Sequence, residues 1–326
     1  MRVIIYGAGG VGGVIGAQLF KAGRDVLLIA RGEHLRRIQS QGLRYQTPHS
    51  DEMLKIPAVA HPDELQLEER DIVVMTMKSQ HTADALDALR ARHGDKVPIV
   101  CCQNGVANER MALRRFAHVY AMLVYLPAQL VEPGRIQCHA TLRSGILDVG
   151  LFPGGIDERC SELAELLNSV NFSVRPDATV MRYKYAKLLT NLNNSLEAVA
   201  PEGPLANDIL ATLKTEGRAC LEAAGIACAN DAEVKSRREG LFKTGSITGV
   251  ARVGGSSRQS LLRGTGDIEA DYLNGEIVQL GRMFNVPTPA NAVLQRLAVQ
   301  AAHQRLAPGT VALDVVAQQI EVEGGK

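Results

Sequence analysis

The sequence lacks an excess of either charge, with 36 lysine and arginine residues against 35 aspartate and glutamate residues and a formal net charge of +1. Nothing in that balance indicates a nucleic-acid or other polyanionic partner. The sequence also lacks an apolar run of the length that a membrane span needs. No charged-then-apolar leader precedes the first strand-like segment, so we expect a cytoplasmic protein.

Paired cysteines and clustered histidines are absent as well. The six cysteines are scattered without a C-x-x-C spacing, and the eight histidines form no H-x-x-x-H or Cys/His cluster. In a large cytoplasmic protein we expect such cysteines to be buried as small apolar side chains. We also expect no bound metal. The 326 residues are enough for two domains with well-buried cores.

The chain does contain a glycine-rich turn between a strand and a helix, within its first twenty residues. Residues 1–6 (MRVIIY) form an apolar run typical of a buried strand, and GAGGVG follows before a segment with helical periodicity. In this context G-x-G-x-x-G is the fingerprint of a dinucleotide site. Gly7 permits the tight turn, Gly9 lets the backbone approach the pyrophosphate, and Gly12 allows the helix to pack closely. An ordinary glycine-rich turn is the alternative.

We expect the phosphates of the dinucleotide to lie at the positive end of the following helix. The loop that would bind them consists of Gly7, Ala8, Gly9, Gly10, Val11 and Gly12.

The end of the second predicted strand indicates which dinucleotide binds. Residues 24–30 (RDVLLIA) form this strand, and NAD sites usually have Asp or Glu at its end to bind the ribose hydroxyls. Here Arg31 follows the strand instead. A guanidinium suits the 2′-phosphate of NADP, which a carboxylate would repel. We therefore expect NADP (NADPH in its reduced form); a solvated loop arginine is the alternative.

The alternation of strands and helices predicts a parallel, doubly wound sheet in the N-terminal part of the chain. Further buried strands are predicted at residues 71–77 and 97–102, with an amphipathic helix between them. Ligands of such sheets lie beyond the carboxyl ends of the strands. Lys78 and Asn104 follow these two strands, so we expect both residues to lie near the glycine loop and Arg31.

The remaining segments predict where the first domain ends. Residues 119–150 predict short strands that extend the sheet and allow antiparallel pairing. A helix over residues 157–170 and a short strand complete the domain, and from about residue 179 the pattern is almost entirely helical. We therefore predict an α/β chain with a nucleotide-binding domain at residues 1–178 and an all-helical domain at residues 179–326.

A polar stripe lies on the first predicted helix of the second domain, residues 181–200. Lys187, Asn191 and Ser195 are four residues apart, so they fall on one face of the helix over two turns. A solvated surface stripe is one interpretation. A buried lysine opposite a glutamate would instead be a credible acid. Glu269 lies at a later polar helix start, where a carboxylate that stabilises the helix dipole is the alternative.

Taken together, these segments resemble the ketopantoate reductase (2-dehydropantoate 2-reductase) family. The matching pieces occur in the family's order and run from GAGGVGG through Arg31, MKSQ at Lys78, QNGV at Asn104 and AKLLTN at Lys187 to SS…IEADYLNG, which ends at Gly275. The resemblance implies a Rossmann-type domain followed by a helical domain, with the active site between them. It also implies an oxidoreductase that uses NADPH to reduce the ketone of ketopantoate to (R)-pantoate, a step in pantothenate and coenzyme A biosynthesis.

The resemblance implies catalytic roles for two side chains. Lys187, in the interdomain cleft, would be the general acid that protonates the forming alkoxide. Glu269 would lie near it, influencing its charge and binding the substrate hydroxyl. Elementary chemistry agrees, because hydride transfer to a ketone develops negative charge on oxygen, which a preorganised ammonium neutralises.

It also implies binding roles. Asn104 would bridge the nicotinamide and the substrate, with Lys78 on the cofactor side. Asn191 and Ser257 would hold polar groups of the substrate. Ser195 stands at a further substrate position, where the family often has a second asparagine.

The sequence departs from the family pattern near the substrate positions. Besides Ser195, residues 258–261 (RQSL) replace the usual Met-Leu-Gln-Asp, and Ile268 replaces a threonine. Another branched or aryl 2-keto acid is therefore the alternative substrate. A non-catalytic NADP-binding sensor is a further alternative, although binding alone needs neither Lys187 nor Glu269. As partners we expect a small 2-keto acid and no nucleic acid or membrane, and the sequence allows a homodimer.

Overall fold

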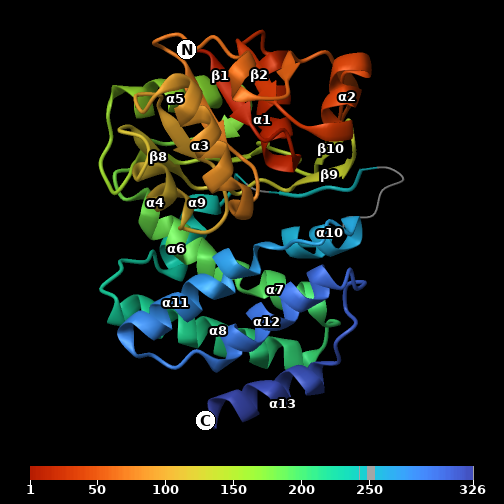
Figure 1. Cartoon of the computed structure of the whole chain (residues 1–326), viewed down its shortest axis with the longest axis vertical. Helices are drawn as coiled ribbons and strands as arrows, with labels where there is room; N and C mark the ends of the chain where they lie inside the picture. The colour runs from red at the N-terminus through yellow and green to blue at the C-terminus, as the bar shows by residue number, and fades with distance from the viewer. Residues whose placement is uncertain (242, 248–253, 326) are drawn as a thin grey trace. The chain divides into compact units, whose positions relative to one another are not determined.

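The computed structural model describes residues 1–241, 243–247 and 254–325, which form two compact units (Figure 1). The first unit contains Met1–Asn104, Asn108–Met181 and the described part of Ala232–Ala251. The second unit contains Gly105–Ala107, Arg182–Asp231 and the described part of Arg252–Lys326.

The first unit is built on a seven-stranded sheet in the order β12-β8-β7-β6-β1-β2-β5. All neighbouring strands pair in parallel except β12, which pairs antiparallel with β8. The central strands are rich in valine and isoleucine because both faces of the sheet are covered. The doubly wound sheet predicted from the sequence is therefore confirmed. Its strands are β1 (Val3–Tyr6), β2 (Val26–Ile29), β5 (Ala58–Val59), β6 (Ile72–Met75), β7 (Ile99–Cys101), β8 (Val119–Met122) and β12 (Val149–Leu151).

The region predicted to extend this sheet does so only in part. β8 and β12 join it, but β9 (Ala128–Glu132) and β10 (Arg135–Cys138) form a hairpin in a separate sheet, ordered β4-β3-β10-β9. The cause is packing on α1, because the side chain of Ile136 fills the space that Gly13 leaves open. The other strands outside the main sheet are β3 (Leu43–Gln46), β4 (Asp51–Leu54), β11 (Gly145–Ile146) and β13 (Phe172–Ser173).

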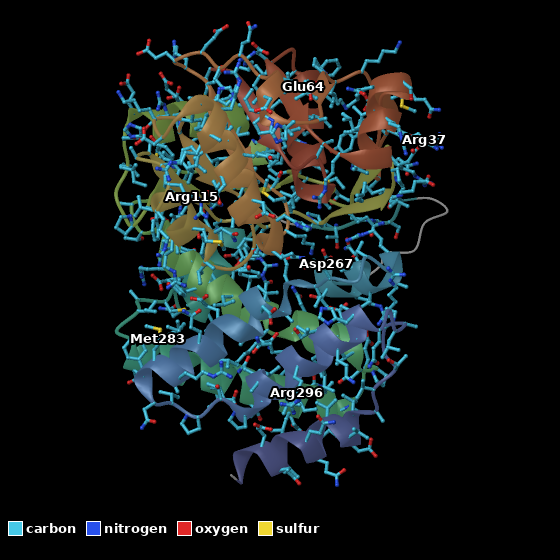
Figure 2. All side chains as sticks on the ribbon, in the orientation of Figure 1. Arg37, Glu64, Arg115, Asp267, Met283 and Arg296 are labelled. Atoms are coloured by element: carbon cyan, nitrogen blue, oxygen red, sulfur yellow. The ribbon has the colours of Figure 1, made fainter. Side chains whose placement is uncertain are left out.

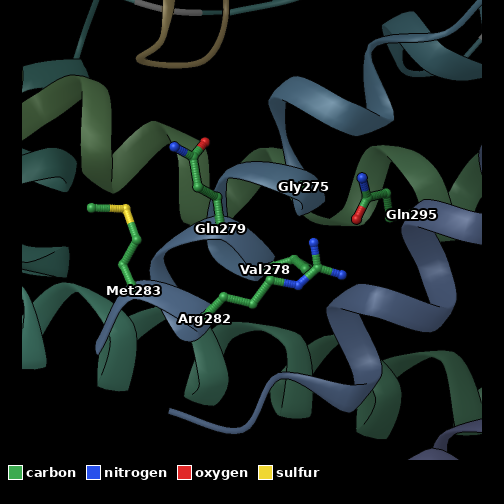
Figure 3. A pocket seen from close by; sticks show the side chains of 6 residues that line it. All are labelled: Gly275, Val278, Gln279, Arg282, Met283 and Gln295. Carbon is green, nitrogen blue, oxygen red and sulfur yellow. The ribbon is translucent and has the colours of Figure 1, made fainter. Parts of the chain in front are cut away.

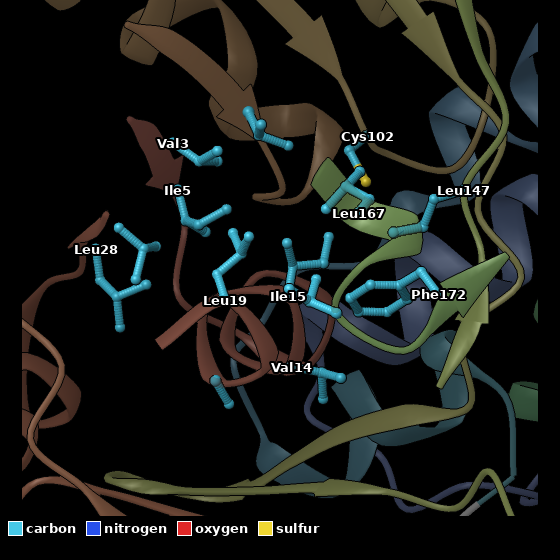
Figure 4. Packing of buried hydrophobic residues seen from close by; sticks show 14 of the residues in the cluster. Val3, Ile5, Val14, Ile15, Leu19, Leu28, Cys102, Leu147, Leu167 and Phe172 are labelled. Atoms are coloured by element: carbon cyan, nitrogen blue, oxygen red, sulfur yellow. The ribbon is translucent and has the colours of Figure 1, made fainter. Parts of the chain in front are cut away.

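Helices cover the main sheet and complete the core of the first unit. Figure 4 shows Ile15 and Leu19 of α1 packed among apolar side chains that include Ile5 and Phe172. Five of the six cysteines are buried and free, as the sequence predicts. The helical segments are α1 (Gly10–Lys21), α2 (Gly32–Gln41), α3 (Thr82–His93), α4 (Asn108–Leu113), α5 (Glu158–Asn168), α9 (Asp231–Arg238) and the 3₁₀ turns η1 (Pro62–Glu64) and η2 (Ser79–His81).

Helices are the only regular secondary structure among the described residues of the second unit. The helix predicted at residues 181–200 is divided, since α6 ends at Asn191 and α7 begins at Asn193. The side chain of Asn274 donates a hydrogen bond to the carbonyl of Leu192 (3.3 Å), which competes with the helical hydrogen-bond ladder at that turn. The segments are α6 (Val180–Asn191), α7 (Asn193–Val199), α8 (Pro204–Ala223), α10 (Ser256–Arg263), η3 (Glu269–Tyr272), α11 (Asn274–Phe284), α12 (Pro289–His303) and α13 (Leu313–Gly324).

The division into units differs from the predicted domains in two segments, of which the shorter, Gly105–Ala107, belongs to the second unit. The change of unit after Met181 lies close to the predicted boundary at residue 178, but the chain returns to the first unit at Ala232. Arg237 on α9 makes a bidentate ion pair with Asp148, with both N···O distances 2.6 Å. The two side chains are 8% and 1% exposed. This buried pair holds α9 against the first unit. No described helix is long and apolar enough to span a membrane.

Candidate active site

The N-terminus of α1 presents backbone N–H groups without acceptors. The helix begins at Gly10, and Gly9 is its N-terminal cap residue. The first N–H group of the helix that donates a hydrogen bond is that of Gly13, whose acceptor is the carbonyl of Gly9 (2.7 Å). The N–H groups of Gly10, Val11 and Gly12 donate no hydrogen bond within the described residues. Three unpaired donors at the positive end of a helix dipole suit a phosphate group.

The glycines hold this loop close to the residues that follow β6, the strand beside β1 in the sheet. A side chain at Gly7, whose φ is +108°, would place its Cβ 2.7 Å from the backbone nitrogen of Met77. At Gly12 the Cβ would lie 2.3 Å from Oγ1 of Thr76. That hydroxyl donates to the Gly7 carbonyl (2.7 Å), a contact that the sequence analysis missed. At Gly9 no atom lies within 4 Å of a Cβ, so the loop is open on that side.

Arg31 lies at the carboxyl end of β2 and is exposed. Its side chain makes no hydrogen bond or ion pair in the part of the chain that the structure describes, although its carbonyl accepts the N–H of Leu35 (3.4 Å). The carboxylate of Glu33 is already held by Arg36 (2.6 Å) and by Arg37 (3.0 Å), which is labelled on α2 in Figure 2. Hydrogen bonds from these arginines lower the pKa of Glu33. An unpaired guanidinium beside a neutralised carboxylate suits a 2′-phosphate.

Buried side chains tie together the loops that carry Lys78 and Asn104. The amide nitrogen of Asn108 donates to Oγ of Ser79 (3.1 Å) and to the carbonyl of Asn104 (3.2 Å). Its amide oxygen accepts a hydrogen bond from Oγ1 of Thr82 (2.8 Å). The backbone of Asn104 and the residue after Lys78 therefore share one buried anchor. Asn108 was not among the predicted site residues, although it lies only four residues beyond Asn104.

In the second unit, two of the predicted substrate residues have buried polar atoms that lack partners. Asn191 ends α6, and its Nδ2 atom is buried without a hydrogen-bond partner among the described residues. Ser257 lies in the first turn of α10, and its Oγ is likewise buried with no partner among those residues. Leaving a buried donor unpaired costs about 1–3 kcal/mol. A bound ligand with oxygen acceptors would satisfy both atoms.

Ser195 lies in an internal hydrogen-bond network. It is fully buried, and its hydroxyl donates to the amide oxygen of Asn274 (2.6 Å). Asn274 donates in turn to Asn291 (3.1 Å), which donates to the carboxylate of Glu216 (2.7 Å). That carboxylate also accepts hydrogen bonds from two backbone N–H groups at the start of α12. Burial raises the pKa of Glu216, although these hydrogen bonds oppose the shift.

The two predicted catalytic residues both belong to the second unit. Lys187 is half-buried on α6, and Glu269 opens η3 with only 3% of its surface exposed. Leu188, Leu189 and Leu192 are buried, so the backbone that carries Lys187 is anchored.

A separate hollow of about 410 Å³ lies along α11 and α12 (Figure 3). None of the predicted site residues lines it. Its lining consists of Gly275, Val278, Gln279, Arg282, Met283 and Gln295.

Comparisons with known proteins bear on both units. Residues 3–154 match the family model described as "Ketopantoate reductase PanE/ApbA", and residues 170–302 match the model of its C-terminal part. A 2-dehydropantoate 2-reductase of Pyrococcus abyssi is 28% identical over 304 residues, which cover 90% of this chain and 95% of that protein.

Solved structures show the same fold. A crystal structure of a PanE/ApbA family ketopantoate reductase from Ralstonia eutropha JMP134 has a TM-score of 0.77 and 28% identity, and the match covers 94% of this chain and 99% of that one. A ternary structure of D-mandelate dehydrogenase with NADH and anilino(oxo)acetate has a TM-score of 0.78 with the same coverage. At 22% identity, that second likeness concerns the fold alone.

Proposed function

The chain belongs to the ketopantoate reductase family of oxidoreductases, and we propose that it reduces ketopantoate to (R)-pantoate with NADPH. The observation that carries this proposal is that two buried donors, Asn191 Nδ2 and Ser257 Oγ, have no hydrogen-bond partner within the part of the chain that the structure describes. Both residues match substrate positions of the family. A 2-keto acid offers hydrogen-bond acceptors in its carboxylate and its ketone, which is what two unpaired donors require.

NADPH fits the residues of the first unit. The free N–H groups of Gly10, Val11 and Gly12 would hold the pyrophosphate, and Arg31 would pair with the 2′-phosphate. When bound, NADPH supplies the hydride that reduces the ketone. We propose that Asn104 contacts both the nicotinamide and the substrate and so bridges them.

The same cofactor assignment extends to Lys78 and Ala8. Lys78 would add positive charge on the cofactor side, and Ala8 forms part of the glycine loop between β1 and α1. These roles are supported by the position of each residue at a carboxyl end of the parallel sheet.

Lys187 is the proposed general acid. Negative charge develops on the ketone oxygen during reduction, and the ammonium of Lys187 would stabilise it and give that oxygen a proton from Nζ. Glu269, as a buried carboxylate, would favour the charged form of the lysine before the reaction and bind the substrate hydroxyl. The buried leucines around Lys187 support the assignment, since an anchored helix fixes where the amine can reach.

One observation favours a second candidate, the reduction of another branched or aryl 2-keto acid. Ser195 replaces the family's usual asparagine, and its hydroxyl already donates to Asn274. We infer that this position stabilises the helices rather than holding the substrate. A substrate site that makes one polar contact fewer with its substrate would accept a less polar keto acid more readily.

The two candidates are separated by rates with NADPH on ketopantoate and on branched and aryl 2-keto acids, compared as kcat/KM. Turnover of any of them excludes the non-catalytic sensor. A homodimer stays a prediction of the sequence, and sedimentation of the purified protein tests it.

A further inference from the structure

His34 connects three segments that are far apart in the sequence. Its ring lies in the first turn of α2, with Nε2 2.6 Å from the carbonyl oxygen of Ala8 in the glycine loop. Its Nδ1 accepts a hydrogen bond from the backbone N–H of Gly134 (2.9 Å), in the turn between β9 and β10. Because Nδ1 is an acceptor, the proton of the neutral ring must be on Nε2, which donates to Ala8.

These contacts hold the β9–β10 hairpin, against which the glycine loop packs. At Gly10 an added Cβ would lie only 3.1 Å from Cα of Gln129 in β9, so the hairpin touches the loop where the free N–H groups begin. Thr76 holds the Gly7 carbonyl from the neighbouring strand. His34 holds the next carbonyl, that of Ala8, and the hairpin turn with the same ring. The shape of the loop therefore depends on a ring that both donates and accepts.

On the basis of the proposed NADPH-dependent function, we propose that His34 is a positioning residue for the cofactor: its neutral ring holds the glycine loop in the form that binds the pyrophosphate, and its protonation weakens NADPH binding.

The chemistry of the imidazole gives the direction of the effect. A protonated ring carries a hydrogen on Nδ1, which would face the N–H of Gly134 and break that hydrogen bond. Burial lowers the pKa of His34, although the hydrogen bond to Ala8 opposes the shift. The folded protein therefore favours the neutral ring, and its contribution to stability is complete above the unfolded pKa of about 6.5 and declines as the pH falls below it.

The other charged side chains near His34 lie on α2, on the residue that caps it and on the β9–β10 hairpin. They are Arg31, Glu33, Arg36, Arg37, Glu132 and Arg135. All are arginines or carboxylates, residue types whose ordinary pKa values lie outside the interval from about pH 5.5 to pH 8, whereas the ordinary pKa of histidine lies inside it.

The test compares NADPH affinity across this pH interval in the full-length protein, followed by the fluorescence of NADPH itself. In His34→Gln the amide can still donate and accept but does not titrate, so its affinity should change less with pH than that of the wild type. In His34→Leu both hydrogen bonds are lost, and binding should be weaker by roughly tenfold at neutral pH. His118→Gln, at an exposed histidine of the same unit, should match the wild type.

Protonation of the 2′-phosphate affects every variant alike, so the difference between variants reports His34. The KM for the keto acid should change by less than about twofold in His34→Gln, because a positioning role acts through the cofactor loop. The same pH dependence in the wild type and in His34→Gln would overturn the inference while leaving the proposed function intact. Absence of NADPH binding at every pH in the wild type would overturn both.

Discussion

Replacing Arg31 by alanine should remove most of the preference for NADPH over NADH. A charge-assisted contact to a phosphate contributes about 1.5–3 kcal/mol, which corresponds to roughly 10- to 150-fold in affinity. Arg31 is exposed, so solvent and salt screen its charge. We therefore expect a loss near the lower end of that range, about tenfold, for NADPH and little change for NADH.

The assay is a fluorescence titration of each reduced cofactor at low and at physiological ionic strength. Arg36→Ala is the matched control, because Arg36 lies on α2, the helix that begins directly after Arg31, and already pairs with Glu33. The loss in Arg31→Ala should shrink as salt is added, whereas Arg36→Ala should stay close to the wild type. Equal affinity of the unmutated protein for NADPH and NADH would refute the assignment of Arg31.

Three further substitutions test the second unit and its boundary. Lys187→Ala should lower kcat by about 10²- to 10⁴-fold, with NADPH affinity within a few-fold of the wild type, and near-full kcat would disprove the acid role. Asn191→Ala should raise the KM for the keto acid by about tenfold without lowering the melting temperature; an unchanged KM would remove Asn191 from the site. Asp148→Asn should lower the free energy of unfolding by about 3–5 kcal/mol in a denaturant titration, because Arg237 is left buried and poorly paired, and a change below about 1 kcal/mol would contradict this.

The nucleotide-binding part of the fold was predictable because its signals are local. Gly7 and Gly12 are required by contacts with the adjacent strand, and a strand, a glycine turn and a helix in succession specify that geometry within twenty residues. Arg31 became a candidate for the same reason, since the end of β2 has a fixed place in such sheets; its role stays a prediction.

The features that the sequence did not predict depend on contacts between distant residues. The division of the helix at Leu192 involves Asn274, and the return of α9 to the first unit depends on Arg237 meeting Asp148. Periodicity along the chain carries no information about either partner. His34 was missed because its function depends on two backbone groups, one of them a hundred residues away.

The proposed site residues of the helical unit were predicted by resemblance more than by pattern. Four-residue spacing indicated a stripe of Lys187, Asn191 and Ser195, yet the structure gives these residues different environments. The amide nitrogen of Asn191 is buried without a partner among the described residues, whereas the hydroxyl of Ser195 is bound within the internal network. Spacing specifies a helix face but does not specify what that face meets.

The measurement that tests the proposed function most directly is the steady-state rate of NADPH oxidation by the wild-type protein with ketopantoate, alongside branched and aryl 2-keto acids. We predict turnover with the highest kcat/KM for ketopantoate and (R)-pantoate as the product. Absence of turnover with ketopantoate, or a higher kcat/KM for an aryl keto acid under the same conditions, would contradict the proposal.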